Sequence, residues 1–168
     1  MPVELKGAYL THPFHINYAN AVSKAHTLVS TIANSFAHAT KAICRKVGGY
    51  MGSVNIMGLT KSLSIEGESN LKSYTPKHSE TGEPLTSKRF FCQNCGSMLW
   101  LHDPSWDEWV YPFASAIDTP LPKAEKTLAI MRGSCPEYIP VPEGSAVLEK
   151  YNNEGIEQWH KSHGAWVD

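Results

Sequence analysis

The pair Cys92 and Cys95, with two residues between them and Gly96 directly after, is the feature that most limits how this chain can fold. Two thiolates at this spacing can bind one tetrahedral zinc ion when the chain between them makes a tight turn. Gly96 allows the backbone to turn back, so that amide groups can point at the sulfur atoms. Segments 88–91 and 97–101 read as strands on either side. The sequence therefore predicts a β-hairpin with a zinc half-site at its tip.

Two other interpretations of this pair stay open, a redox dithiol and a structurally idle pair. A redox dithiol favours a helix that begins at the first cysteine, whereas here a strand follows the second. A structural zinc needs four ligands, so two more must come from elsewhere. The other thiols are Cys44 and Cys135, and the imidazole candidates are His12, His15, His26, His38, His78, His102, His160 and His163. Ordinary polar loop histidines are the alternative interpretation of that set.

Cys44 stands directly before Arg45 and Lys46. Nearby cations lower the pKa of a thiol and favour the thiolate, which is the form that binds metal or reacts. The other interpretation is a cysteine that packs at the end of an apolar stripe.

Strand patterns dominate residues 50–117, and we expect a mainly β fold. Short apolar or alternating runs bounded by turn residues are typical of strands, and they fall at 53–57, 63–65, 71–74, 88–91, 97–101 and 109–114. The polar stretch 75–88 reads as a loop. The length of 168 residues suits a single domain over 1–168.

The two ends of the chain differ from this middle. Before it, apolar or small residues recur with helical spacing at Val22, Ala25, Val29, Ile32, Phe36, Ala39 and Ile43, and a Gly-Gly pair at 48–49 would end the helix. Residues 16–43 are thus expected to be helical or poorly ordered. After it, five prolines in 118–168 predict a proline-rich arm rather than sheet. A short closing helix is expected at 155–163.

Charge and hydropathy exclude several function classes. The chain has 15 basic and 16 acidic residues, so no basic excess points to nucleic acid and no charge run to a membrane surface. No apolar run approaches the length of a spanning helix, and residues 1–6 lack the layout of a signal peptide. We therefore expect a cytoplasmic protein, in which cysteines serve metal binding or catalysis rather than disulfides.

Several separated motifs recur in order at 43–50, 54–58, 91–100, 111–118 and 159–164. Together they resemble the glutathione-dependent formaldehyde-activating enzyme family, also called the centromere protein V family, and most of all its fungal members. The resemblance covers about 43–168. It implies a small zinc-binding, β-tent-like fold.

The resemblance also implies two zinc sites and a reaction. An early Cys-x-Cys and the later pair, here Cys92 and Cys95, hold a structural zinc. A Cys-x-Cys-x-x-Cys run, whose last member matches Cys44, holds a second zinc that is thought to be catalytic. The implied activity is that of a carbon–sulfur lyase, with S-hydroxymethylglutathione as product and a small thiol as the substrate partner.

The sequence departs from this pattern in its first part. Residues 8–12 lack the early Cys-x-Cys, and Ala39 and Lys41 stand where the second run would have thiols, so four of seven expected cysteines are absent. Three explanations compete: a gene-model error within 8–43, true divergence, or substitution by histidines such as His12, His15 and His38. Because structural zinc often supplies folding energy and part of this zinc framework is missing, we expect 8–43 to be the least ordered part of the fold.

Two functions follow from these observations. The first is a zinc-dependent carbon–sulfur lyase acting on a small thiol–aldehyde adduct, with Cys44 as a second-zinc ligand at the catalytic site. The second is a catalytically inactive zinc-knuckle scaffold of the same fold. Arg45, Lys46 and Arg89 could hold the carboxylates of a glutathione-like ligand, although solvated charge is the default interpretation. The sequence defines neither the exact thiol nor the oligomeric state.

Overall fold

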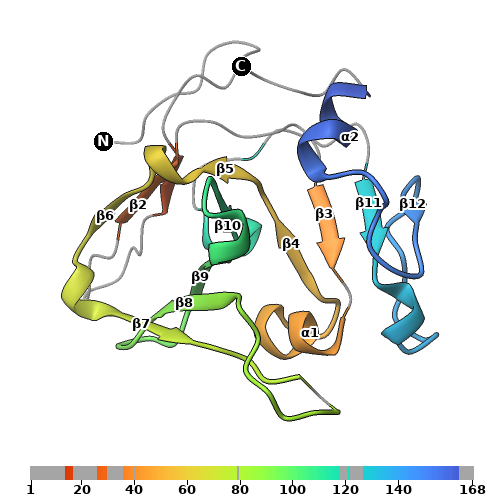
Figure 1. The fold of residues 1–168 in the computed structure, drawn as a ribbon, viewed down its shortest axis with the longest axis horizontal. Coiled ribbons are helices and arrows are strands. Elements are labelled where there is room, and N and C mark those ends of the chain that lie inside the picture. The colour runs from red at the N-terminus through yellow and green to blue at the C-terminus, as the bar shows by residue number, and fades with distance from the viewer. Residues whose placement is uncertain are drawn as a thin grey trace.

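The computed structural model describes residues 14–16, 26–29, 36–39, 41–78, 80–117, 121 and 127–162. In these ranges the chain is mainly β, with few and short helices (Figure 1). The helices are α1 (Ala42–Gly48) and α2 (Ile156–Ser162). The strands are β1 (Phe14–Ile16), β2 (His26–Val29), β3 (Phe36–Ala39), β4 (Ser53–Asn55), β5 (Gly58–Leu59), β6 (Ser64–Glu66), β7 (Leu71–Tyr74), β8 (Lys88–Cys92), β9 (Met98–His102), β10 (Trp109–Pro112), β11 (Thr127–Ile130) and β12 (Ala146–Val147).

The described strands form three sheets. The largest is antiparallel, with strand order β5-β10-β9-β8-β7. A second sheet has the order β12-β11-β3-β4, in which β11 pairs in parallel with both β3 and β12. The third is antiparallel, with the order β1-β2-β6. In Figure 1 the five-stranded sheet lies between the other two.

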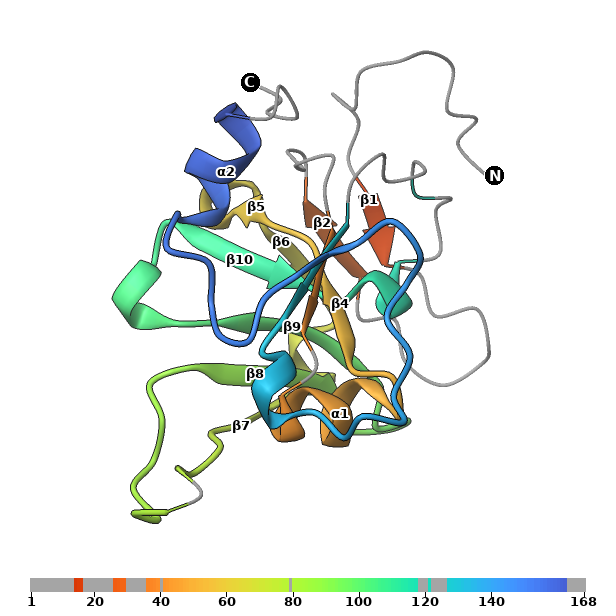
Figure 2. The ribbon, with the colours of Figure 1, turned by 90° about the vertical axis from the view of Figure 1, so that its right-hand side faces the viewer.

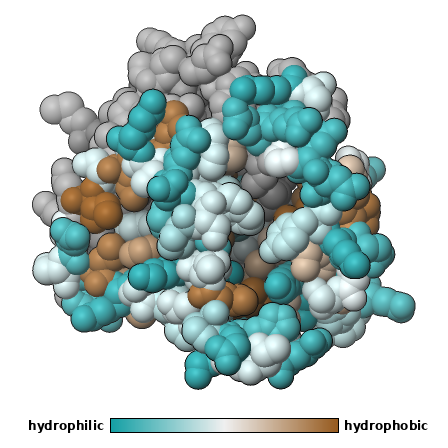
Figure 3. Space-filling model, in the orientation of Figure 1, coloured by the Kyte–Doolittle hydropathy of each residue, from teal (hydrophilic) through white to brown (hydrophobic). Residues whose placement is uncertain are grey.

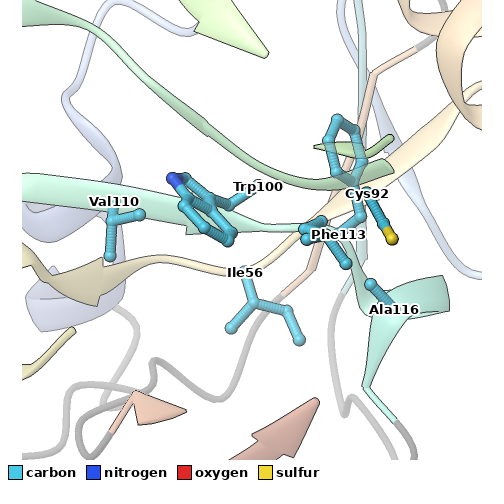
Figure 4. Close-up of a cluster of buried hydrophobic side chains, with 7 residues drawn as sticks. Ile56, Cys92, Trp100, Val110, Phe113 and Ala116 are labelled. Atoms are coloured by element: carbon cyan, nitrogen blue, oxygen red, sulfur yellow. The ribbon is translucent and has the colours of Figure 1, made fainter. Parts of the chain in front are cut away.

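The core lies on the five-stranded sheet, where apolar side chains from several strands meet. Its buried members are Ile56, Cys92, Leu99, Trp100, Val110, Phe113 and Ala116, most of them drawn in Figure 4. The rings of Phe90 and Trp100 stack with centroids 5.0 Å apart. Fully burying one large apolar side chain stabilises a fold by about 1.5–3 kcal/mol. This cluster therefore fixes β8, β9 and β10, the strands that carry the hairpin, against one another.

Most of the predicted middle region is confirmed. Strands occur in every run expected between 53 and 114, and β8 and β9 form the predicted hairpin around the cysteine pair. Between β7 and β8, the described part of the loop contains a single isolated bridge from Lys77 to Pro84 rather than a strand. The helix expected at 155–163 is present as α2.

The helix predicted within 16–43 is wrong where the structure describes this segment. Residues 26–29 and 36–39 are strands, and the helix starts only at Ala42. Val29 and Phe36 fit the helical spacing, but pairing with β1, β6, β4 and β11 offers these segments a complete ladder of backbone hydrogen bonds, and such tertiary context overrides local propensity. The rest of 16–43, and most of the segment 8–43 whose order was questioned, lies outside the described residues. The predicted stop is correct, because α1 ends at Gly48 and Gly49 has a φ of 99°.

The proline-rich arm is also partly wrong, because it contributes β11 and β12 to a sheet. The prolines of this region lie at 120, 122, 136, 140 and 142. Both strands fall between or after these positions, in runs without proline, so no ladder hydrogen bond is lost. Prolines at intervals therefore separate short strands here rather than excluding them.

Within the described ranges no helix is long and apolar enough to cross a membrane. The face of the molecule in Figure 3 carries hydrophobic residues only in small areas separated by hydrophilic ones.

Tyr111 of β10 makes the fold sensitive to alkali. Burial raises the pKa of its phenol from 10.0 to about 12, and the Asp103 carboxylate adds to the rise. Because the folded state holds this proton more tightly than the unfolded state, its contribution to stability is complete below pH 10 and is lost as the pH rises through about 12.

We expect Tyr111→Phe to remove this alkaline loss of stability. At about 1.4 kcal/mol per pKa unit, the loss amounts to as much as about 3 kcal/mol in the free energy of unfolding. Urea unfolding of both proteins between pH 7 and pH 12 checks it. The two stability curves should run parallel at neutral pH and converge in alkali. Curves that stay parallel up to the highest pH would show that this phenol is not responsible.

Candidate functional site

Cys44 is positioned by the junction of β3, α1 and β4. Ala39, the last residue of β3, pairs with Ser53 of β4, and the chain then turns into α1. The first turn of α1 therefore lies over Ser53, and the side chains of Cys44 and Ser53 are hydrogen-bonded. Ser53 is buried and also donates to Asn55 Oδ1 at 2.8 Å.

The close approach of α1 to β4 depends on Gly48. A Cβ atom at this position would stand 2.7 Å from the Cβ atom and 2.9 Å from the Cα atom of Ser53. Real Cβ atoms essentially never come within 3.0 Å of other heavy atoms. Glycine thus lets the helix pack directly on the strand, and Figure 2 shows α1 next to β4. This contact fixes the helix that carries Cys44.

The Cys44 thiol lies in a positively charged environment and is nevertheless held neutral. Burial raises its pKa, and the hydrogen bond to Ser53 and the charges of Arg89, Lys41 and Arg45 oppose that rise without outweighing it. Neighbouring cations do lower this pKa, as expected, but burial outweighs them, so the expected thiolate is not favoured. Loss of hydration destabilises the thiolate more than the neighbouring positive charges stabilise it.

Arg89 is the cation that sequence reasoning treated as solvated charge, and the structure contradicts that interpretation. Its residue is only 6% exposed, and desolvation lowers the pKa of its guanidinium. One nitrogen, Nη1, donates to Ser87 Oγ at 3.0 Å. No carboxylate in the described part of the chain forms an ion pair with it.

The groups around Arg89 are mainly a thiol and two phenols. Cys44, Tyr151 and Tyr74 act on its charge most strongly, and the Asp103 carboxylate acts least. Asp103 is occupied elsewhere, since it accepts hydrogen bonds from Thr86 Oγ1 at 2.8 Å and from the Ser105 amide at 3.0 Å. The buried cation is therefore only weakly compensated.

Ser53 and Tyr151 are members of this site that sequence reasoning missed. No sequence signal marks Ser53 or Tyr151. Arg89 could have been found, because it directly precedes the apolar run Phe90-Phe91-Cys92 and alternates with the exposed Lys88 along β8.

The Cys92–Cys95 hairpin has the tight turn that the sequence predicted. The Gly96 amide donates to Cys92 O at 2.8 Å, the Cys92 amide donates to Ser97 O at 2.9 Å, and Gly96 has a φ of 74°. Cys92 is 1% exposed and its sulfur points toward Ala116 (Figure 4), whereas Cys95 is exposed and lies 3.4 Å from Ser97 Oγ.

This turn is tied to the chain before β7. The Gln93 amide donates to Asn70 O at 2.8 Å, Gln93 Nε2 donates to Ser69 O at 2.8 Å, and Asn94 Nδ2 donates to Asn70 Oδ1 at 3.1 Å. The hairpin tip is thus held by hydrogen bonds of the protein itself.

The described residues supply two donors at the hairpin and do not complete a metal site. No group of three His, Cys, Asp or Glu side chains suited to a metal occurs among them, so Cys44 does not join Cys92 and Cys95. At Cys44 the neighbours in sequence, Ala39 and Lys41, offer a methyl group and a cation instead of thiolates. This donor set does not fit a second zinc.

The remaining candidate ligands lie elsewhere or outside the described residues. Cys135 accepts a hydrogen bond from Arg132 Nη1 at 3.1 Å. His78 Nδ1 accepts from the amides of Glu80 and Thr81, and His102 lies in β9. His12, His163 and the side chains of His15, His26, His38 and His160 lie outside the described residues.

Comparison with known proteins identifies the family. Residues 23–130 match the family described as "Glutathione-dependent formaldehyde-activating enzyme". A protein of Halomonas elongata named "Putative glutathione-dependent formaldehyde-activating enzyme" is 33% identical over 126 residues, which is 73% of this chain and 79% of that protein. The chain belongs to this family, as the ordered motifs indicated. A crystal structure of a Rhodobacter sphaeroides protein has 18% identity and a TM-score of 0.45, covering 58% of this chain and 84% of that one.

The family match begins upstream of residue 43, where the resemblance was expected to start. It includes β3, which pairs in register with β4 and β11. Residues 36–39 therefore lie within the segment that matches the family.

We expect Gly48→Ala to destabilise the protein by about 1–3 kcal/mol, because the added methyl group overlaps Ser53 and forces α1 away from β4. Urea unfolding measures the loss. Gly155→Ala is the matched control, since a Cβ atom there meets nothing within 4 Å. Equal stability of the two variants would mean that the helix is not in close contact with the strand.

Proposed function

We propose that this protein makes or breaks the carbon–sulfur bond of a small thiol–aldehyde adduct of the S-hydroxymethylglutathione type. Membership of the family and the name of the Halomonas relative support the reaction class. The observation that carries the proposal for this chain is the buried guanidinium of Arg89 beside the Cys44 thiol. A weakly compensated buried charge next to a perturbed thiol is typical of a functional site.

The reaction separates charge, and a fixed cation stabilises that charge. When the adduct breaks down, its hydroxyl loses a proton, the C–O bond becomes a carbonyl, and the electron pair of the C–S bond leaves on sulfur. In the reverse direction the thiolate attacks the aldehyde carbon and the oxygen takes a proton. Negative charge thus passes between sulfur and oxygen, and positive charges held in a site of low dielectric stabilise it without reorganisation. Lys41 and Arg45, which act on the Cys44 sulfur together with Arg89, are suited to this role.

Zinc at the hairpin is a separate part of the proposal. Cys92 and Cys95 offer two thiolates in a turn of suitable shape, and two further ligands from outside the described residues would complete a tetrahedral structural site. Such a metal would contribute folding energy rather than chemistry. No second zinc is proposed at Cys44, because Ala39 and Lys41 cannot replace the thiolates of the family pattern.

The zinc assignment predicts one zinc ion per chain in purified protein, measured by elemental analysis. Cys92→Ser and Cys95→Ser should each lower the zinc content strongly, because a structural site binds zinc much more weakly when one of its four ligands is removed. Cys44→Ser is the control and should leave it unchanged. Two zinc ions per chain, or loss of zinc in the Cys44 variant, would contradict the assignment.

A non-catalytic scaffold is the second candidate function, and the specific observation in its favour is the loss of thiols at 39 and 41. Exchange spectroscopy by NMR on glutathione and formaldehyde distinguishes the two. An enzyme accelerates exchange between free thiol and adduct above the spontaneous rate, and Cys44→Ala should lower that acceleration about tenfold or more, in the range seen when active-site contacts are removed.

Cys135→Ser is the matched control for that experiment, because Cys135 contacts Arg132 rather than the Cys44 site. It should exchange at the wild-type rate. Folded, zinc-containing protein that leaves the spontaneous rate unchanged would establish the scaffold instead.

A further inference from the structure

Arg89 carries a cost that its protein contacts do not offset. A buried charge is stable in a protein when it is paired and fully hydrogen-bonded. Arg89 is only 6% exposed, yet within the described residues its side chain makes one hydrogen bond, to the neutral hydroxyl of Ser87. A planar guanidinium has five donors and pairs best with a carboxylate, which accepts two of them side by side. That partner is missing from the described residues.

The other side-chain nitrogens of Arg89 are not completely sealed from solvent. Among the described residues, Thr60 Oγ1 is the side-chain polar atom that is sealed from solvent without a hydrogen bond. The unbonded nitrogens of Arg89 are therefore not sealed, although the side chain as a whole is buried. A guanidinium whose stem is packed and whose donors are unpaired but not fully sealed is suited to accept a ligand.

Several positive charges act on this place. Three cations act on the Cys44 sulfur, Arg89 in β8, Lys41 at the N-cap of α1 and Arg45 within α1, and no carboxylate among the described residues does so. Arg45 also donates to Ser134 O at 3.3 Å, which anchors it beside the site. β8 and α1 are separated in sequence by the loop and strands between 49 and 87, so the fold brings these charges together.

We propose that Arg89 binds a carboxylate of the thiol substrate, with Lys41 and Arg45 adding to the attraction, so that the site selects thiols that carry a carboxylate. The inference rests on the proposed function, because it takes the ligand to be a small thiol or its aldehyde adduct. Glutathione has two carboxylates, and neutral thiols of similar size have none. Arg89 acts here as a specificity-determining residue.

The test measures binding in the absence of formaldehyde, so it does not depend on turnover. Wild-type protein is titrated by calorimetry with glutathione and with glutathione diethyl ester, in which both carboxylates are neutralised. A charge-assisted hydrogen-bonded contact contributes about 1.5–3 kcal/mol, so the ester should bind about 10- to 100-fold more weakly. Equal affinity for the two ligands overturns the proposal, and this comparison needs no variant.

Variants then assign the preference to one residue. Arg89→Gln should remove the preference for the free acid, and Arg89→Lys should keep part of it, since the charge remains and the fork is lost. Lys88→Gln is the matched control, because it removes one positive charge from an exposed position on the same strand and should keep the preference. A Gln variant that stays folded and keeps the full preference also overturns the proposal.

The two proposals fail in different ways. Selective binding of glutathione without accelerated exchange would disprove the enzymatic function and keep the carboxylate site. Accelerated exchange with equal affinity for acid and ester would keep the function and disprove the carboxylate site.

Discussion

The contact between Gly48 of α1 and Ser53 of β4 is the constraint on which the candidate site depends. The helix has only seven residues and no side-chain cap at its start, so it has little stability of its own. It is held because glycine permits backbone-distance packing on the strand. Once it is held, the Cys44 thiol interacts with Ser53 through a hydrogen bond and with the charge of Arg89. Arg89 of β8, Cys44 of α1 and Ser53 of β4 therefore come together because residue 48 has no side chain.

The sequence predicted the parts of the fold that local patterns determine. The hairpin at Cys92 and Cys95, the strands of the middle region and α2 follow from alternation, turn residues and spacing. The sequence did not predict strands β3 and β11, which lie far apart in the chain and pair with each other in parallel. Neither segment alternates clearly, and each becomes a strand because of the other. Long-range pairing of this kind leaves no local signature.

The site was predictable to a similar extent. Cys44 was identified from its family position, but the state of its sulfur was not, because burial is a property of the folded chain and outweighed the nearby cations. Arg89 was noticed as a charge and misjudged as solvated. A charge in a strand can face water or the interior, and the choice depends on what packs against that strand. The turn at Cys92 and Cys95, by contrast, was predictable because it is determined locally, within four consecutive residues.

The link between Arg45 and Ser134 spans 89 positions of the chain. Together with the pairing of β3 and β11, it means that the surroundings of Cys44 are assembled from both halves of the domain. During synthesis the first half leaves the ribosome well before its partner strand exists, and contacts between distant segments form late. The thiol at position 44 therefore spends the early life of each new molecule outside the environment that holds it neutral.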